Sequence, residues 1–238
     1  MCSLPQNDVV FLFDVDNTLI DSDRVIKDLR RYLTREVGDP ATDEYFAIFE
    51  ELRGELGYAD YLGALQRYRL AHPREPNLLA VSHFLLNYPF ANRLYPGSLD
   101  AVEHCARFGL PVILSDGDVV FQPRKVERSG LFELFEGRVL IYVHKEQELS
   151  DIEQRFPALH YVLVDDKIRI LSAIKAAWGP RLTTVFARQG HYANDPRVSE
   201  LRTALMACGF GGGQSLRALH RSPVSGPLAV SGLELFRR

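Results

Sequence analysis

The 238-residue sequence predicts an α/β fold, a doubly wound parallel sheet with an all-helical segment inserted after its first strand. Three observations support this prediction. Residues 9–13 form a solidly apolar run that ends abruptly in polar, turn-forming residues, as a buried strand does. Residues 23–88 repeat apolar side chains at helical spacing. After residue 95, apolar strand patterns alternate with helical patterns, which is typical of a parallel sheet covered by helices on both faces.

Each element follows from a local pattern. The first strand is apolar at consecutive positions because both of its faces are expected to be buried. In the helical segment, glycine and proline interrupt the period near residues 38–40, 54–57 and 72–76, which leaves about four helices. The elements expected after it are helix 99–108, strand 112–114, helix 123–129, strand 139–143, helix 147–155, strand 161–164, helix 168–178, strand 183–186 and helix 198–208.

These elements predict four segments. Residues 1–20 begin the core, residues 21–92 form the inserted helical domain, and residues 93–210 complete the core. Residues 211–238 are rich in Gly, Ser and Pro and lack periodicity, so we expect a flexible tail. The sheet is therefore expected to form from two pieces of chain that flank the helices.

The composition is that of an ordinary globular protein. Of the residues, 46% are apolar and 25% are charged, and the formal net charge is −3, which excludes a disordered or collagenous chain. No apolar run approaches the roughly 20 residues of a membrane helix, and the first residues do not resemble a secretion signal. Three scattered cysteines fit a reduced compartment. We therefore expect a cytoplasmic protein without a membrane partner; the lack of Lys/Arg blocks argues against nucleic acid, and the oligomeric state is open.

The side chains capable of chemistry lie where the predicted strands end. In a doubly wound sheet, ligands bind in the crevice at the carboxyl ends of the strands. These positions hold Asp14, Asp16, Ser115, Asp116, Asp118, Lys145, Asp165 and Asp166. Carboxylates packed in a partly dry cleft repel one another unless a cation holds them ionised. Oxygen ligands without a soft neighbour favour Mg²⁺, so we expect a magnesium site in this crevice.

Each of these groups also has a purely structural interpretation. The two aspartates after the first strand are residues that cap loops, and residues 115–118 also form a good turn. Lys145 fits a solvated helix start, and the acidic pair at 165–166 fits a helix N-cap, a role compatible with metal binding. The seven histidines show no ligand spacing and are treated as background. Aromatic residues between 45 and 68 are assigned to the core of the helical domain.

The ordered motifs resemble those of a known family. Residues 13–22, Phe-Asp-Val-Asp-Asn-Thr-Leu-Ile-Asp-Ser, resemble the Asp-x-Asp-x-Thr motif of the haloacid dehalogenase-like hydrolase superfamily. Ser115, Lys145 and the pair Asp165-Asp166 are similar to its second, third and fourth motifs, in the same order. The resemblance covers residues 8–208 and implies a Rossmann-like core.

Short linker signatures narrow the resemblance to one branch. Tyr-Pro-Gly at 95–97, Phe-Gly at 108–109 and Ser-Gly-Leu-Phe at 129–132 are similar to those of the branch that includes phosphoglycolate phosphatase and β-phosphoglucomutase. That branch carries a helical cap between its first and second motifs. The resemblance therefore implies that residues 21–92 are such a cap.

The resemblance also implies a role for each site residue. Asp14 would be the nucleophile that forms an aspartyl-phosphate, and Asp16 would protonate the leaving alcohol and then deprotonate the attacking water. Lys145 would offset charge on the phosphate and on Asp14. The phosphoryl oxygens would be held by Thr18, Ser115 and the backbone N–H groups of Asp116 and Gly117. Mg²⁺ would be bound by Asp14, the backbone carbonyl of Asp16, and Asp166, with Asp165 close by.

Two departures from the family pattern accompany these matches. The third motif reads His-Lys-Glu-Gln at 144–147 and lacks the Lys-Pro-x-Pro that the branch often shows, and Ile170 stands where many members have a further acidic residue. The second aspartate of the first motif matters most, because dehalogenases of the superfamily lack an acid/base there. Asp16 therefore argues against dehalogenation.

The sequence predicts a Mg²⁺-dependent phosphatase that acts on a small phosphorylated metabolite. Two alternatives stay open. A phosphotransferase or mutase of the same superfamily would use the same residues but pass the phosphoryl group to an acceptor other than water. A non-catalytic member would bind a phosphate ligand or a protein partner without turnover.

Overall fold

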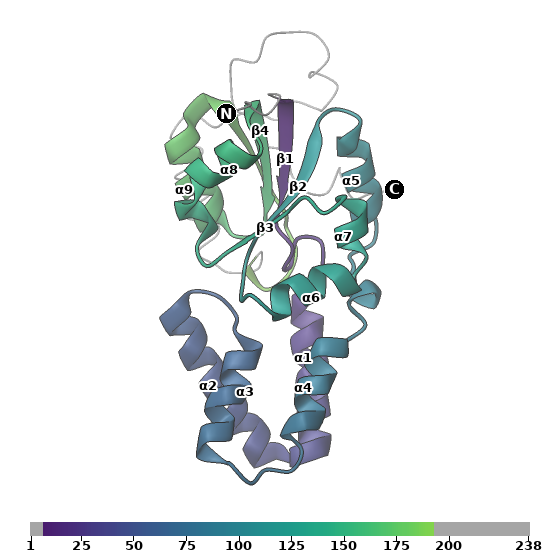
Figure 1. The fold of residues 1–238 in the computed structure, drawn as a ribbon, viewed down its shortest axis with the longest axis vertical. Helices are drawn as coiled ribbons and strands as arrows, with labels where there is room; N and C mark the ends of the chain where they lie inside the picture. The colour runs from purple at the N-terminus through teal and green to yellow at the C-terminus, as the bar shows by residue number, and fades with distance from the viewer. Residues whose placement is uncertain (1–6, 193–238) are drawn as a thin grey trace.

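The computed structural model describes residues 7–192, and the helix expected at 198–208 and the tail at 211–238 lie outside them. Five parallel strands form one sheet in the order β3-β2-β1-β4-β5 (Figure 1). The strands are β1 (Asn7–Phe13), β2 (Leu110–Asp116), β3 (Val139–Tyr142), β4 (Ala158–Asp165) and β5 (Leu182–Phe186). The predicted α/β fold with a parallel sheet is confirmed. Because β1 lies between β2 and β4, its carboxyl end adjoins the ends of both neighbours.

Helices cover the two faces of the sheet, and the alternation of side chains along β1 explains why. Val10 and Leu12 point into one apolar cluster, whereas Phe11 and Phe13 point into the other. The face of Val10 and Leu12 is covered by α8 (Leu149–Arg155) and α9 (Ile168–Trp178). The opposite face is covered by α5 (Ser98–Ala106), α6 (Phe121–Arg128) and α7 (Leu131–Leu134).

Four further helices form a block at the carboxyl ends of the strands (Figure 1). They are α1 (Ser22–Val37), α2 (Asp39–Leu56), α3 (Tyr61–Ala71) and α4 (Leu78–Asn87), in the segment where about four helices were expected. Local chemistry sets their ends: Asp60 accepts a hydrogen bond from the Gly63 N–H at 2.7 Å, and Gly57 ends α2 in the left-handed conformation that glycine favours.

Aromatic packing joins the helical block to the sheet. The ring of Phe121 on α6 lies 4.9 Å from that of Tyr61 on α3 and 5.7 Å from that of Phe90. The two segments that connect the helical block to the sheet also lie side by side, because the Asp21 N–H donates to the carbonyl of Arg93 at 2.7 Å. The block and the sheet therefore share one apolar cluster and are linked by two adjacent segments.

Two local features differ from the sequence prediction. The helix expected from residue 147 begins at Leu149, and Lys145–Gln147 form a short 3-10 turn before it. The cause is a contact between residues far apart in the sequence. The Asp116 carboxylate accepts the Lys145 N–H at 2.8 Å and fixes the chain at this point. The four-residue α7 was not anticipated as a separate helix.

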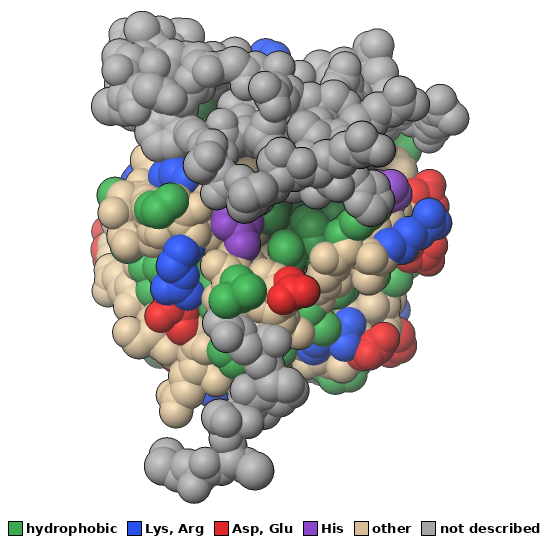
Figure 2. Space-filling view, turned by 90° about the horizontal axis from the view of Figure 1, so that it is seen from above, with side chains coloured by type: hydrophobic (Ala, Val, Ile, Leu, Met, Phe, Trp, Pro, Cys, Tyr) green, Lys and Arg blue, Asp and Glu red, His purple; other side chains and the backbone are tan. Residues whose placement is uncertain are grey.

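The surface at the end of the sheet away from α1–α4 carries acidic and basic side chains side by side (Figure 2). Within residues 7–192, no helix combines the length and the apolar character that crossing a membrane requires.

Candidate active site

Three buried carboxylates meet at the carboxyl ends of β1 and β4. Asp14 directly follows β1, Asp165 ends β4, and Asp166 comes next in the chain. One oxygen of each lies within 4.8 Å of the others. The parallel arrangement of β1 and β4 causes this convergence, since the Asp14 N–H donates to the carbonyl of Val164 at 2.9 Å. The sequence prediction brought these three residues to one crevice, and the structure places them there.

Lys145 is fully buried beneath this cluster. Its Nζ lies 2.6 Å from Asp14 Oδ1 and 2.7 Å from Asp165 Oδ2, and it also donates to the carbonyl of Leu114 at 3.2 Å. Burial alone would lower the pKa of Lys145, but the two carboxylates outweigh it and raise this pKa above its ordinary value. The second Asp14 oxygen accepts the Thr18 hydroxyl at 3.0 Å. Both oxygens of Asp14 are thus held in place.

Asp166 differs sharply from its neighbour in its partners. Both of its carboxylate oxygens are buried without a hydrogen-bond partner among the described residues. Burial, together with the charges of Asp14 and Asp165, raises the pKa of Asp166 to about 9. Asp165, by contrast, is engaged by Lys145 and accepts the Lys167 N–H at 2.7 Å. An unpartnered buried carboxylate beside a second one fits a hard divalent cation, so Asp14 and Asp166 suit Mg²⁺.

The Asp16 carboxylate lies outside this cluster and faces a pocket. Lys125 Nζ is 2.5 Å from Asp16 Oδ1, Gln122 donates to Oδ2 at 2.8 Å, and the Ser22 hydroxyl also donates to Oδ1. Burial alone would raise the pKa of Asp16, but the charge of Lys125 and these hydrogen bonds lower it to about 2. Asp16 is therefore ionised and held in one orientation. For metal binding, the sequence prediction used only its backbone carbonyl.

The residues after β2 behave in three different ways. Ser115 is buried, and its hydroxyl accepts the Gln122 side-chain N–H at 2.8 Å. Asp116 accepts the backbone N–H of Lys145. The Gly117 N–H, expected to hold a phosphoryl oxygen, instead donates to the carbonyl of Tyr142 at 2.9 Å. This bond continues the β2–β3 ladder past the strand end, so that donor is occupied by the protein itself.

Gly117 leaves room for the residue that orients Asp16. A Cβ at this position would lie 2.7 Å from Gln122 Cβ and 2.8 Å from Gln122 Cγ. We expect Gly117→Ala to displace Gln122 and to lower the free energy of unfolding by about 1–3 kcal/mol in urea titrations. Gly54→Ala is the matched control, because that exposed helical glycine has no atom within 4 Å of its would-be Cβ. It should raise the free energy of unfolding by up to about 1 kcal/mol. Equal effects of the two substitutions would contradict this account.

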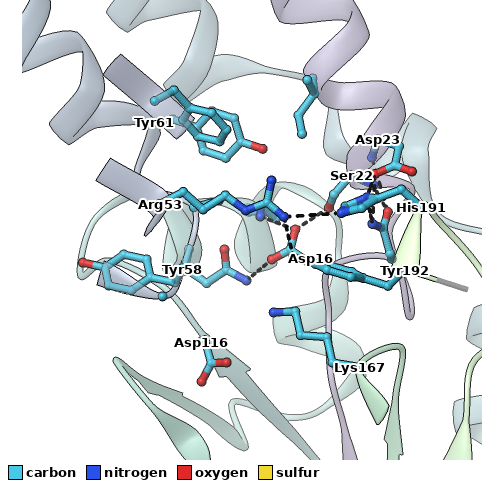
Figure 3. A pocket seen from close by; sticks show the side chains of 17 residues that line it. Asp16, Ser22, Asp23, Arg53, Tyr58, Tyr61, Asp116, Lys167, His191 and Tyr192 are labelled. Carbon is cyan, nitrogen blue, oxygen red and sulfur yellow. Dashed lines mark hydrogen bonds and ion pairs between the residues drawn. The ribbon is translucent and has the colours of Figure 1, made fainter. Parts of the chain in front are cut away.

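The pocket in front of Asp16 lies between the strand ends and the helical block (Figure 3). Three strong bases line it: Arg53 from α2, Lys125 from α6, and Lys167 after β4. Arg53 Nη2 is 3.3 Å from His191 Nε2 and donates to the Tyr192 hydroxyl, whereas His191 Nδ1 is 2.6 Å from an Asp23 oxygen. The segment after β5 thus contacts both α1 and α2 across the mouth of the site.

Several of these residues were missed by the sequence analysis. Gln122 and Lys125 carried a signal, because they lie on the buried face of α6 beside Phe121 and Val126, where polar side chains are unusual. His191 was treated as background but lies at the pocket. Its position 168 residues from Asp23 leaves no local pattern to find. Phe49 and Tyr61, assigned to the helical core, are buried there and also line the pocket.

Comparisons with known proteins show which family this sequence is similar to. A family model described as haloacid dehalogenase-like hydrolase matches residues 9–177. A crystal structure of a protein described as a haloacid dehalogenase-like hydrolase, from Burkholderia xenovorans, is 62% identical, covers 81% of this chain and 87% of its own, and has a TM-score of 0.78. No curated protein matches the sequence.

Two more distant structures share the fold alone. A protein described as a β-phosphoglucomutase from Thermotoga maritima is 16% identical, covers 96% of each chain, and has a TM-score of 0.54. The L-2-haloacid dehalogenase of Xanthobacter autotrophicus is 18% identical, covers 94% of each chain, and has a TM-score of 0.52. Because these two neighbours differ in their named activities, the fold does not choose between phosphate and halide chemistry.

Proposed function

This chain belongs to the haloacid dehalogenase-like hydrolases, and from that premise we propose that it is a Mg²⁺-dependent phosphatase. Its substrate would be a small phosphorylated metabolite, hydrolysed through an aspartyl-phosphate on Asp14. The proposal rests chiefly on one observation: Asp14 and Asp16, two residues apart, lie in separate environments with separate partners. Such a division suits one nucleophile and one proton-transfer group.

The surroundings of Asp16 favour phosphate esters over halides. A departing halide needs no proton, whereas an alkoxide leaving from a phosphate ester does. Asp16 faces the pocket and is held there by Lys125, Gln122 and Ser22. A carboxylate held facing the pocket can transfer a proton during ester hydrolysis. Dehalogenation does not need that step.

The chain's own residues support each step of the reaction. Lys145 and Thr18 fix the oxygens of Asp14, which orients the nucleophile toward phosphorus. In the free pocket Asp16 is ionised, the form that accepts a proton from the attacking water. The negative charge of a bound phosphoryl group would raise the pKa of Asp16 and so favour the protonated form that a leaving alkoxide needs.

The acidic cluster is suited to Mg²⁺, with Asp14 and Asp166 as its side-chain ligands. When bound, Mg²⁺ would neutralise carboxylate charge and let a phosphate dianion approach Asp14. Burial raises the pKa of Asp14 despite the nearby Lys145, so a cation also favours the ionised nucleophile.

The helical block would serve as a cap over the pocket. It contributes Arg53, Phe49 and Tyr61 to the lining and joins the core through two adjacent segments. Closure of such a block excludes bulk water and favours compact substrates over phosphoproteins.

Metal removal provides the test of this function. We expect a panel of phosphorylated metabolites to contain substrates whose phosphate release with Mg²⁺ falls to background in excess EDTA and returns when Mg²⁺ is restored. Mg²⁺ should also raise the melting temperature, because it binds Asp14 and Asp166 in the folded state only. Phosphate release that is indifferent to EDTA would exclude the metal from the mechanism.

The same panel separates the two alternatives. A mutase would depend on a bisphosphate primer, whereas a phosphatase releases phosphate without one. A non-catalytic member would be stabilised thermally by a phosphorylated ligand but would release no phosphate at any Mg²⁺ concentration.

A further inference from the structure

The ammonium group of Lys145 is enclosed by acceptors of the protein itself. A protonated lysine has three N–H donors. The Lys145 Nζ faces three acceptors: Asp14 Oδ1 at 2.6 Å, Asp165 Oδ2 at 2.7 Å and the carbonyl of Leu114 at 3.2 Å. The side chain is also 0% exposed. Lys145 therefore holds the nucleophile from below and is not among the residues that line the pocket.

Lys167 presents the opposite situation at the same strand ends. Its backbone N–H donates to Asp165 Oδ1 at 2.7 Å, which fixes the residue directly behind the acidic pair. Its side chain lines the pocket beside Asp16 and Asp116 (Figure 3). Within residues 7–192, its Nζ makes no hydrogen bond or ion pair, and it lies 5.7 Å from the centre of the Tyr192 ring. Its three donors are thus available to a ligand in the pocket.

The other two bases of the pocket are already engaged. Lys125 is paired with Asp16 at 2.5 Å. Arg53 contacts Glu50, His191 and Tyr192. Among the described pocket residues, Lys167 is therefore the strong base whose charge is not committed to a hydrogen-bonded partner.

We infer that Lys167 donates hydrogen bonds to the phosphoryl oxygens of the substrate, and that Lys145 is a positioning residue for Asp14 and Asp165. This inference rests on the proposed function, since it concerns how the same site binds its phosphate. The expectation from the sequence was that Lys145 would offset charge on both the phosphate and Asp14, and the inference gives the phosphate to Lys167 instead. Lys167 directly follows the acidic pair Asp165-Asp166, and the phosphoryl group must approach Asp14 beside that pair. The Lys167 ammonium is therefore well placed to contact the phosphoryl oxygens.

Binding of inorganic phosphate tests the inference without turnover. With saturating Mg²⁺ present, isothermal titration calorimetry of the full chain should give a phosphate dissociation constant that rises about 10- to 100-fold in Lys167→Met. Lys167→Arg should recover part of that affinity, since arginine also donates to phosphate. Lys27→Met, on an exposed position of α1, is the matched control and should bind as the wild type does.

Lys145→Met should behave differently from Lys167→Met. It removes the cation from a buried pair and should lower the melting temperature markedly, whereas Lys167→Met should leave it nearly unchanged. If the wild type binds phosphate and Lys167→Met binds it equally well, the inference is overturned but the proposed function is not. A wild-type chain that neither binds phosphate nor releases it from any substrate would overturn the proposed function with it.

Discussion

Asp14→Asn is expected to lower the turnover of phosphate monoesters by about 10⁴-fold or more, because the neutral amide cannot attack phosphorus. The substitution keeps the shape of the side chain, and the carbonyl oxygen of the amide still accepts a hydrogen bond from Thr18 or Lys145. Phosphate binding should therefore persist while chemistry stops. Single-turnover phosphate release and calorimetry with inorganic phosphate would separate the two effects.

Asp118→Asn is the matched control for this loss of charge. Asp118 follows β2 near the site, and its Oδ1 accepts the N–H groups of Val120 at 2.8 Å and Phe121 at 2.6 Å. The Oδ1 of asparagine accepts the same two hydrogen bonds, so turnover should stay within about twofold of the wild type. Turnover retained in Asp14→Asn would show that another group attacks phosphorus.

The second large effect concerns Asp16→Asn, which should distinguish between leaving groups. With an alkyl phosphate, the rate of phosphoenzyme formation should fall about 10²–10⁴-fold, because the alkoxide loses its proton donor. With an aryl phosphate the loss should be far smaller, since a good leaving group hardly needs that proton. In Asp14→Asn, the rate of phosphoenzyme formation should fall equally with both substrates. Rapid-quench kinetics on the two substrate types would measure the difference.

A stability measurement must accompany Asp16→Asn, because the substitution leaves Lys125 without its carboxylate. Lys125 is 3% exposed, so its uncompensated charge should lower the melting temperature. Asp16→Asn combined with Lys125→Met removes that charge and should recover stability while keeping the preference for the aryl substrate. Equal losses on the two substrates in both variants would show that Asp16 is not the proton donor.

The architecture and the acidic cluster could be read from the sequence because local patterns determine them. The consecutive apolar side chains of β1 require burial on both faces, and alternating strands and helices require a parallel sheet. A parallel sheet in turn brings all strand ends to one edge. Asp14, Lys145 and Asp166 therefore converge even though they lie far apart in the chain. The identities of the strands, and of the residues at their ends, were enough to predict that meeting.

Only the tertiary structure decided which of these side chains already have hydrogen-bond or ion-pair partners. The sequence does not distinguish Asp165 from Asp166, whereas the structure gives Asp165 a lysine and leaves both oxygens of Asp166 without a hydrogen bond. It also pairs Asp16 with Lys125, 109 residues away, and surrounds the Lys145 ammonium with Asp14, Asp165 and the carbonyl of Leu114. Hydrogen-bond capacity and charge pairing depend on atoms supplied by distant elements at distances of 2.5–3.2 Å. Sequence spacing carries no information at that scale, so the separate roles of two neighbouring carboxylates, or of two lysines at one edge of a sheet, emerge only when the chain is folded.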